Sequence, residues 1–561
     1  MKSIIKIMSI IAVGAYMLCS CEGFIPETRV DLDTVEDIAN SNYNNLYQQG
    51  IHVYHYLPNG YGRIGNAMLA AATDEADYAV PGSTIEYLQN GTWNPVTNPD
   101  DKWDNCYYGI KRARQFLKNS EGYEDIILRD TSTTASKQNY LDQCADLKCL
   151  RAENKAMIGL IYFELLKRYG GVPIVNKEYT LESAPDMVRN SYDEVVNYIV
   201  TNIDEALPDL KESWQAYKPA DFGRLEIGSA LAIKARVLLY AASPAYNLTG
   251  DPLKWEKAAA AAREVIELGR YRLAADYGTM FLGLNGHQNS EAILCYMTGE
   301  NNTMEALNYP ISTNGGKTGT CPSANLVDAY EFADGTPFDW TKVAPGEDPY
   351  AGRDPRLQKT VVVNGSTWNG RTMEIYEGGK EGLDVVKATT TGYYLKKFLT
   401  DGLDLELGHT AVHSWPVIRY ADVLLMYAEA MNEAYGPDVD FYNDGHTARW
   451  AVNQIRTRAG MPNVVAYTQA DMRARICHER RVELAFEEHR YWDAKRWGQE
   501  TAAAVLGAPL MGVKITQNGT GFDYENFTVE NRVYEAKMLY YPIPQSETLE
   551  TDGLISQNPG W

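Results

Sequence analysis

The chain has 561 residues, of which 45% are hydrophobic and 22% are charged, and this composition excludes a wholly disordered polypeptide. It carries 52 Lys and Arg against 74 Asp and Glu. The resulting net charge of −22 excludes a general binder of nucleic-acid backbones, because the long-range field repels polyanions. Tyrosine is unusually common, with 39 Tyr and 11 Trp against 12 Phe. Such side chains combine an apolar face with a polar group and favour partly solvated recognition surfaces.

The N-terminal residues have the pattern of an export signal. A basic start precedes an apolar run over residues 7–18, which is too short to cross a bilayer as a helix. The run ends in Leu-Cys-Ser-Cys, which resembles a bacterial lipobox and implies cleavage before Cys21 and lipidation of its thiol. An ordinary signal peptide with an incidental cysteine is the alternative. We expect residues 1–20 to be removed and residues 21–561 to be anchored to a membrane by lipid.

Five later segments carry apolar side chains at the three- and four-residue spacing of an amphipathic helix. The first runs from 191 to 210 and starts with a capping box of Ser191 and Glu194. The others lie at 230–242, 255–266, 424–435 and 448–459, and Gly269 is placed to end the third helix. Short links predict antiparallel pairs, although no 34-residue consensus repeats cleanly. We therefore predict a mostly α fold, a degenerate tetratricopeptide-like scaffold of helical hairpins.

Two stretches lack this helical spacing. One spans about residues 77–101, and the other, at approximately 283–405, is rich in Gly, Asn, Thr and Pro. Long irregular segments in a compact protein are usually functional loops. We expect a helical scaffold at approximately 35–282 and 406–561 that carries both irregular regions on one face, with 283–405 as a loop-rich, ligand-binding insertion.

Motifs for catalysis and for metal binding are incomplete. The six cysteines after Cys21 include no Cys-x-x-Cys pair, so we predict no metal site and no cofactor. Cys144 and Cys149 are close enough in sequence to pair, and the sequence leaves that open. Asp74 and Glu75 form a carboxylate pair of the kind a glycosidase needs, but 74 acidic residues produce such pairs by chance. We predict that the protein is not an enzyme, with a glycosidase as the alternative.

Several motifs of the C-terminal half together form a recognisable series. They are Trp415–Ala430, Asn453 with Arg456–Gly460, Glu479–Glu487, His489–Asp493, Pro542–Pro544 and Gln557–Trp561. Tyr169–Pro173, Arg353–Arg356 and Thr391–Tyr394 add three more. With these motifs in this order, the chain resembles the SusD/RagB family of surface lipoproteins from Bacteroidetes-type bacteria.

The resemblance implies a function. Members of the family bind nutrient, usually oligosaccharide or polysaccharide, and are not enzymes. They pair with a SusC-type TonB-dependent outer-membrane transporter and act as its lid. The resemblance therefore implies a lipid-anchored, surface-exposed protein of the outer membrane with no nucleic-acid partner. A peptide-uptake lipoprotein of the same architecture, or a structural transporter subunit with no ligand of its own, are the alternatives.

Aromatic and amide side chains of the two irregular regions are the candidate ligand-binding residues. Sugar rings stack their CH faces on Trp and Tyr, while their hydroxyls need polar partners. The candidates are Tyr87, Asn90, Trp93, Tyr309, Asn314, Trp340, Tyr350 and Trp368. For each of them, packing in the core is the alternative.

We assign a structural role, rather than ligand binding, to the motifs rich in Arg and Glu. Arg419 with Asp422, and Arg480 with Glu483, have the i, i+3 spacing of pairs on one helix. We predict that these charges hold helices together rather than bind a ligand.

Overall fold

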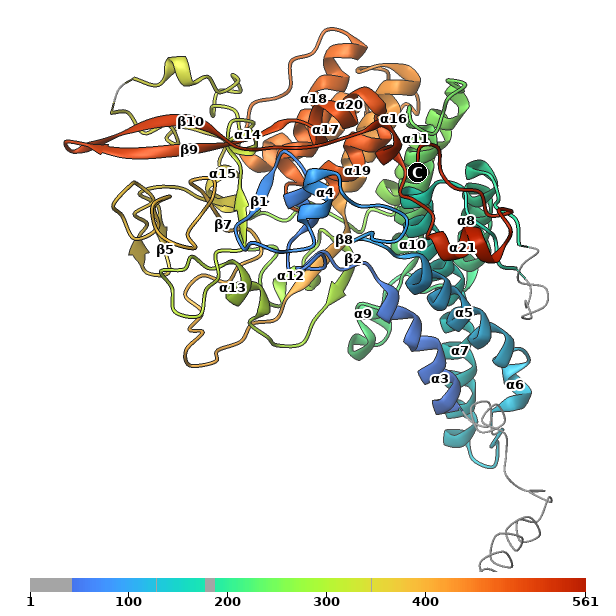
Figure 1. Cartoon of the computed structure of the whole chain (residues 1–561). Helices are drawn as coiled ribbons and strands as arrows, with labels where there is room; N and C mark the ends of the chain where they lie inside the picture. The colour runs from blue at the N-terminus through green and yellow to red at the C-terminus, as the bar shows by residue number, and fades with distance from the viewer. Residues whose placement is uncertain (1–42, 128, 177–186, 345) are drawn as a thin grey trace, which may run out of the picture.

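The computed structural model describes residues 43–127, 129–176, 187–344 and 346–561, so the predicted signal peptide and Cys21 lie outside it. The fold is mostly helical, as predicted. Figure 1 shows the long helices on one side of the molecule, and loops, short strands and one long hairpin on the other. In the described part of the chain, we find no helix with both the length and the apolar character needed to cross a bilayer.

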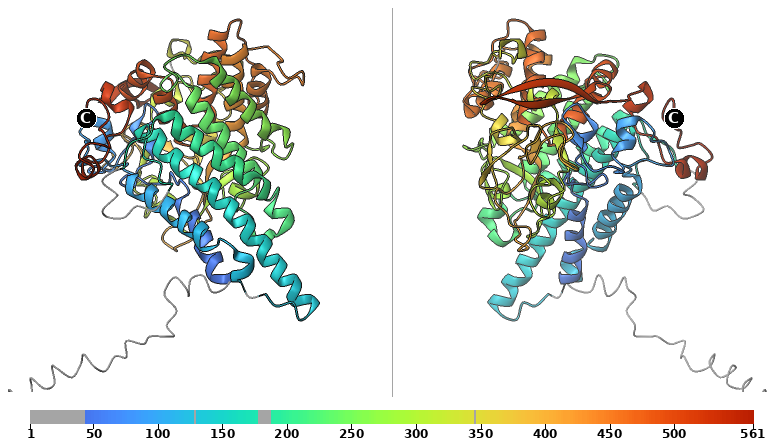
Figure 2. Two further views of the ribbon diagram at one scale, coloured as in Figure 1. Left: turned by 90° about the vertical axis from the view of Figure 1, so that its right-hand side faces the viewer. Right: turned by 60° about the vertical axis from the view of Figure 1, so that its left-hand side comes forward.

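The longer helices build the helical side. The longest is α7 (Thr134–Tyr169), which packs against α5 (Trp103–Asn119) and α8 (Tyr192–Ala206). The others are α3 (Tyr43–Ile51), α10 (Ile227–Ala242), α11 (Pro252–Glu267), α16 (Tyr420–Tyr435), α17 (Ala448–Ala459), α18 (Gln469–Glu483), α19 (His489–Arg496) and α20 (Gln499–Leu506). α10 packs on α11, α11 on α16, and α16 on α17, and Figure 2 (left) shows α5, α7, α8, α10 and α11 side by side. This pairing of neighbours along the chain is compatible with helical-hairpin repeats.

All five predicted helices are present, at α8, α10, α11, α16 and α17. The capping box at the start of α8 forms, because Ser191 Oγ accepts the backbone N–H of Glu194 and the Glu194 carboxylate accepts that of Ser191. α8 ends at Ala206, earlier than predicted, and a short 3₁₀ turn, η4 (Leu207–Asp209), follows. Pro208 lies in that turn, where it has no N–H to continue the α-helical hydrogen bonds.

The remaining elements are short, and most of them lie in the two irregular regions. In and before the first region lie η1 (His52–Tyr56), η2 (Leu69–Ala72), β1 (Ala76–Tyr78) and α4 (Glu86–Asn90). The second region holds α12 (Asn285–Gln288), β2 (Ala292–Met297), α13 (Thr303–Asn308), β3 (Thr320–Pro322), α14 (Ala324–Val327), η6 (Trp340–Lys342), α15 (Leu357–Thr360), β4 (Val361–Val362), β5 (Thr367–Trp368), β6 (Arg371–Thr372) and β7 (Tyr394–Leu395). Elsewhere lie α6 (Tyr123–Ile126), α9 (Trp214–Tyr217), η5 (Pro219–Asp221), β8 (Ser414–Arg419), η7 (Ala536–Leu539) and α21 (Gln545–Glu550).

The described strands pair antiparallel, two by two: β1 with β3, β2 with β8, β4 with β7, β5 with β6, and β9 (Pro509–Asn518) with β10 (Gly521–Asn531). The β1–β3 pair joins the two irregular regions. The β9–β10 hairpin turns at Gly519 and Thr520 and extends away from the body, as Figure 1 shows. This hairpin was not predicted from the sequence.

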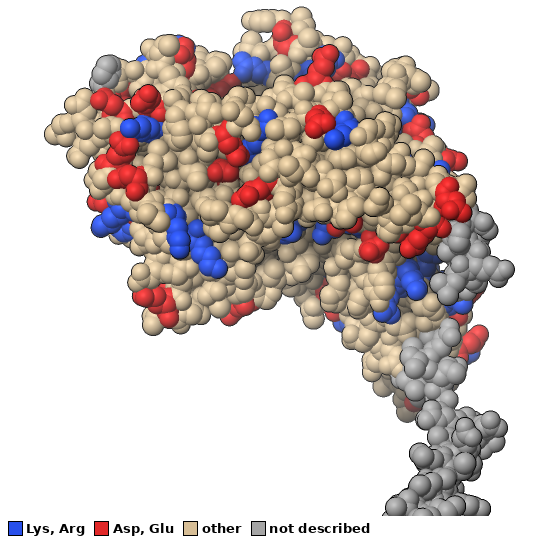
Figure 3. All heavy atoms as spheres, viewed as in Figure 1, with Lys and Arg blue, Asp and Glu red and all other residues tan. Residues whose placement is uncertain are grey.

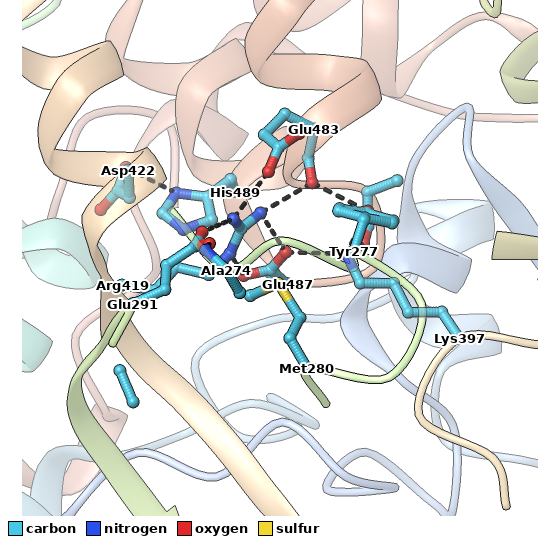
Figure 4. Close-up of polar contacts among 12 residues, drawn as sticks. Ala274, Tyr277, Met280, Glu291, Lys397, Arg419, Asp422, Glu483, Glu487 and His489 are labelled. Carbon is cyan, nitrogen blue, oxygen red and sulfur yellow. Dashed lines mark hydrogen bonds and ion pairs between the residues drawn. The ribbon is translucent and has the colours of Figure 1, made fainter. Parts of the chain in front are cut away.

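A buried ionic network lies where the helices meet the loops (Figure 4). Arg419 is only 1% exposed, and its guanidinium donates to Glu291 at 2.5 Å and to Glu483 and Glu487 at 2.7 Å each. Lys397 Nζ donates to the same Glu487 at 2.7 Å. The network therefore links β8, α18 and loop residues far apart in the sequence, which agrees with a structural role for these charges.

The predicted i, i+3 pairs do not form. Arg419 is the last residue of β8 and has extended backbone angles (φ −128°, ψ 164°), so helical spacing does not apply to it. Asp422 instead accepts from Arg236 at 2.6 Å and from Arg480 at 3.2 Å. Arg480 also donates to Asp493 of α19 at 2.7 Å, rather than to Glu483.

Candidate functional site

A groove of about 640 Å³ opens where the two irregular regions meet the hairpin. Ala79 and Pro81, which follow β1, line it together with Leu383 and residues 385–390. Phe527 and Val529 of β10 complete the lining. Figure 1 shows β1 and α4 close to the root of the hairpin, so the groove lies at the loop-rich end of the molecule.

Hydrogen bonds hold the segments around the groove in place. The backbone N–H of Ala79 donates to Gly319 O at 2.8 Å, which extends the β1–β3 pairing. Thr390 Oγ1 donates to the carboxylate of Asp77 at 2.6 Å. Gln89 of α4 donates to Ala71 O at 2.9 Å. The groove is therefore a preformed feature built from segments that are distant in sequence.

Two residues at this groove have positive φ angles. Lys387, which lines the groove, and Thr318, which is bonded to it, have φ values of +66° and +70°, which non-glycine residues seldom adopt. Thr318 Oγ1 donates to Lys387 O at 2.8 Å. Strain of this kind persists where the surroundings impose it, and it occurs often at ligand sites.

The groove offers an apolar surface with a polar edge. Its lining is mainly aliphatic and aromatic, with Lys387, Thr389 and Thr390 as the polar members. Val386 is 81% exposed, so it is available to a ligand. On the face shown in Figure 3, acidic and basic side chains are interspersed among uncharged ones, and neither sign forms one continuous patch. A largely uncharged ligand with apolar faces would fit these properties.

Four candidate residues from the sequence lie at least partly on the surface. Tyr87 is 40% exposed on the outer face of α4, and Asn90 is exposed at the end of the same helix. Asn314 lies in the loop that supports the groove and donates to Glu406 at 2.8 Å. Trp340 is half-buried beside Tyr524 of β10, with its ring N–H donating to Asp328 at 3.0 Å.

The other four candidates are packed in the core, which was the alternative for each. Trp93 is 3% exposed because Tyr541 and Trp561 cover it at ring distances of 4.9 and 4.7 Å. Trp368 and Tyr309 are buried against each other, with ring centroids 6.1 Å apart. Tyr350 is buried against Tyr393 and Tyr524. In this conformation none of these four rings presents a free face to a ligand.

The adjacent carboxylates are buried and ion-paired, and the neighbouring cysteines are not disulfide-bonded. Asp74 is held by Arg481 and Arg490, both at 2.8 Å, and it is buried together with Glu75. Burial, with a contribution from Asp74, raises the pKa of Glu75 to about 7. Cys144 and Cys149 both lie on α7 and are free thiols.

Comparison with known proteins places the chain in a family. Residues 287–561 match the model of the SusD family. SusD-like protein P25 of Formosa agariphila is 24% identical over 523 residues, which cover 85% of this chain and 87% of that protein. A SusD-like protein of Bacteroides ovatus is 24% identical, and the match covers 75% of this chain and 76% of that protein. The chain belongs to the SusD family.

Solved SusD-like structures share the fold. A SusD-like protein from Bacteroides fragilis is 23% identical, with a TM-score of 0.76 over 94% of this chain and 98% of that one. A SusD-like carbohydrate binding protein from the same species is 24% identical, with a TM-score of 0.75 over 92% and 99%. A laminarin binding SusD-like protein is 22% identical, with a TM-score of 0.61 over 93% and 100%.

The SusD motifs of this chain have structural explanations. At Gly171, a Cβ atom would lie 2.1 Å from Asn190 O, so a side chain has no room there. Gly392 has φ +85°, and a Cβ atom on it would lie 2.2 Å from Val513 O of β9. Arg356 is buried and donates to Glu479 at 2.6 Å. These motifs therefore maintain the scaffold and the root of the hairpin, rather than the lining of the groove.

The residues that line the groove were not predicted from the sequence. Pro81, residues 383–390, Phe527 and Val529 were not candidates. One signal was present, since Asn518-Gly519 between two alternating segments is a strong hairpin pattern, and the hairpin supplies one side of the groove.

Proposed function

We propose that this SusD-family protein is a lipid-anchored protein of the outer membrane that captures nutrient oligosaccharide or polysaccharide at the cell surface. It delivers the glycan to a SusC-type TonB-dependent transporter, acts as that transporter's lid, and does not cleave the glycan. The preformed groove at the loop-rich end is the observation that carries this proposal. Two SusD-like proteins of the same fold, described as carbohydrate binding and laminarin binding, support the ligand class.

The groove suggests how the glycan would be held. Pro81, Val386 and Phe527 offer apolar surface for the CH faces of sugar rings. Lys387 and Thr390 supply polar groups for hydroxyls. Of the candidates from the sequence, Tyr87 and Asn90 on α4 and the partly exposed Asn314 and Trp340 remain proposed contacts for a longer ligand.

A titration of oligosaccharides tests this proposal. We expect the lipid-free chain to bind at least one member of a glycan panel in calorimetry or affinity electrophoresis. Val386→Asp places a charge in the groove and should weaken binding at least about tenfold, the effect of roughly 1.4 kcal/mol. Val465→Asp is the matched control, because Val465 is 61% exposed in the link between α17 and α18 and does not line the groove.

The outcomes separate the alternatives. Unchanged binding in Val386→Asp would discard the groove as the site. Peptide uptake is the second candidate function, favoured by the apolar lining, and binding of peptides but of no oligosaccharide would support it instead. A chain that binds neither ligand but co-purifies with a barrel protein would be a structural subunit. Failure to co-purify with any barrel protein would contradict the role as a lid.

A further inference from the structure

Two histidine side chains lie next to each other on the surface at the end of α3. η1 (His52–Tyr56) follows α3 without a break, and Figure 1 shows α3 beside α7. Side chains three residues apart in a 3₁₀ helix lie above one another, so His52 and His55 share one face of η1. Both side chains are exposed, and their rings stack with centroids 4.7 Å apart and planes 28° apart. Neither of them lines the groove.

The turn that carries this histidine pair is anchored to the rest of the protein. Val53, between the two histidines, is only 1% exposed. The hydroxyl of Tyr54 donates to the buried carboxylate of Glu153 at 2.7 Å. Tyr56 packs closely on α5, where a Cβ atom at Gly109 would lie 2.8 Å from its ring. The backbone beneath the two imidazoles is therefore preorganised.

The spacing of the two rings fits a shared metal ion. Imidazole nitrogens bind Zn²⁺ and similar ions at about 2.0–2.1 Å, and neighbouring ligands subtend about 90° in octahedral sites and about 109° in tetrahedral ones. Because a ring centroid lies about 1.2 Å behind its nitrogen, two imidazoles on one ion have centroids about 4.5–5.2 Å apart. The centroid distance of 4.7 Å between His52 and His55 falls within this range.

The surroundings of the two imidazoles suit their use as ligands. His55 Nδ1 lies 3.2 Å from His52 O, and a carbonyl oxygen only accepts, so Nδ1 carries the proton. The lone pair of His55 is then on Nε2, as is usual in metal-binding histidines. Partial burial lowers the pKa of His52, with His55 and Arg112 as further causes. The imidazole of His52 is therefore neutral at pH 7, as a metal ligand must be.

We propose that His52 and His55 together bind one divalent transition-metal ion of the Zn²⁺, Ni²⁺ and Cu²⁺ class. Imidazole suits these ions, whereas Mg²⁺ and Ca²⁺ prefer oxygen ligands. In the part of the chain that the structure describes, no cluster of three or more potential ligands is present, so water completes the coordination and the ion is exchangeable. The proposal departs from the sequence-based prediction of no metal site, and it does not depend on glycan binding.

Calorimetric titration of the untagged, lipid-free chain with ZnCl₂, NiCl₂ and CuCl₂ near pH 7 tests the proposal. We expect one ion at this site, held most tightly when it is Cu²⁺. His52→Ala and His55→Ala should each weaken binding at least about tenfold, since the loss of even an outer partner of a metal ligand costs about 10–100-fold. The double variant should lose little more, because either single change already removes the two-point attachment. His409→Ala is the matched control, because it removes another exposed histidine and should leave binding unchanged.

Electron paramagnetic resonance of the Cu²⁺ complex gives a second measurement. The spectrum should show two imidazole nitrogens on the ion in the wild-type chain and one in either single variant. Arg112→Gln should tighten binding by about two- to fivefold, because it removes a nearby positive charge that repels the ion.

Three results would overturn the proposal. The first is that no ion binds, and the second is that His52→Ala and His55→Ala bind as tightly as the His409→Ala control. The third is that each single variant lowers the number of ions bound without weakening the affinity, because the two imidazoles would then act independently. Circular dichroism checks that the variants are folded, and if His55→Ala alters the fold, His52→Ala decides alone.

Discussion

Replacing Arg419 by alanine tests the structural role of the buried ionic network most sharply. Its guanidinium contacts the carboxylates of Glu291, Glu483 and Glu487 at 2.5–2.7 Å, and all four side chains are at most 1% exposed. The substitution leaves three buried carboxylates with fewer cations around them. Removing one partner of a buried ion pair costs about 3–5 kcal/mol, so the free energy of unfolding should fall by about that amount. Such a loss is a large share of the free energy of unfolding of a typical domain, which is about 5–15 kcal/mol.

The assay is urea denaturation of the lipid-free chain, followed by tryptophan fluorescence and circular dichroism. Arg473→Ala is the matched control, because Arg473 is half-exposed and pairs with Glu433 near the surface. Exposed pairs contribute about 0–1 kcal/mol, so the control should lose little stability. A loss below about 1 kcal/mol in Arg419→Ala, or a loss equal to that of the control, would refute the argument.

The same variant should change the dependence of stability on pH. Burial alone would raise the pKa of Glu483, but Arg458, Arg419 and Arg356 outweigh it and hold this pKa well below its usual value of 4.5. A carboxyl group with a depressed pKa stabilises the folded state above pH 4.5, and this contribution is lost as the pH falls toward the folded-state pKa. The wild-type chain should therefore lose stability below about pH 4.5, and Arg419→Ala should lose less over the same range.

Three further substitutions have defined outcomes in the same denaturation assay. Glu75→Gln should stabilise the protein by about 3 kcal/mol at pH 8 and hardly at pH 4, because burial raises the pKa of Glu75 from 4.5 to about 7. An equal stabilisation at both pH values would contradict this dependence on the charge of Glu75. Lys495→Met should stabilise it by about 1–4 kcal/mol at pH 7, since burial lowers the pKa of this lysine and its amine has no hydrogen-bond partner among the described residues. That gain should shrink toward pH 10, and a loss at pH 7 would count against it. Gly392→Ala should lower the free energy of unfolding by about 1–3 kcal/mol, because a Cβ atom would lie 2.2 Å from Val513 O. Wild-type stability in this variant would disprove the close approach of the two backbones.

The helices were predictable because their signals are local. The apolar spacing within 191–210 and the capping box at its start specify α8 without reference to the rest of the chain. The burial of Trp93 was not predictable in this way, since Trp561, at the far end of the sequence, covers it. The prediction that Arg419 lies on a helix was wrong, because the boundary between β8 and α16 falls at this residue. Its extended backbone changes the direction of its side chain.

Local sequence patterns could not predict the groove. Its lining residues come from around β1, from loop 383–390 and from β10, and only the folded chain brings them together. Lys387 adopts a backbone conformation that the sequence gives no reason to expect. The aromatic content of the irregular regions did not distinguish exposed rings, such as Tyr87, from buried ones, such as Trp93.

The most direct test of the proposed function is a crystal structure of the lipid-free chain with the oligosaccharide that binds best in the titration. We predict density for sugar rings in the groove, against Pro81, Val386 and Phe527, with hydroxyls near Lys387 and Thr390. Density for the oligosaccharide elsewhere on the molecule, with an empty groove, would contradict the account.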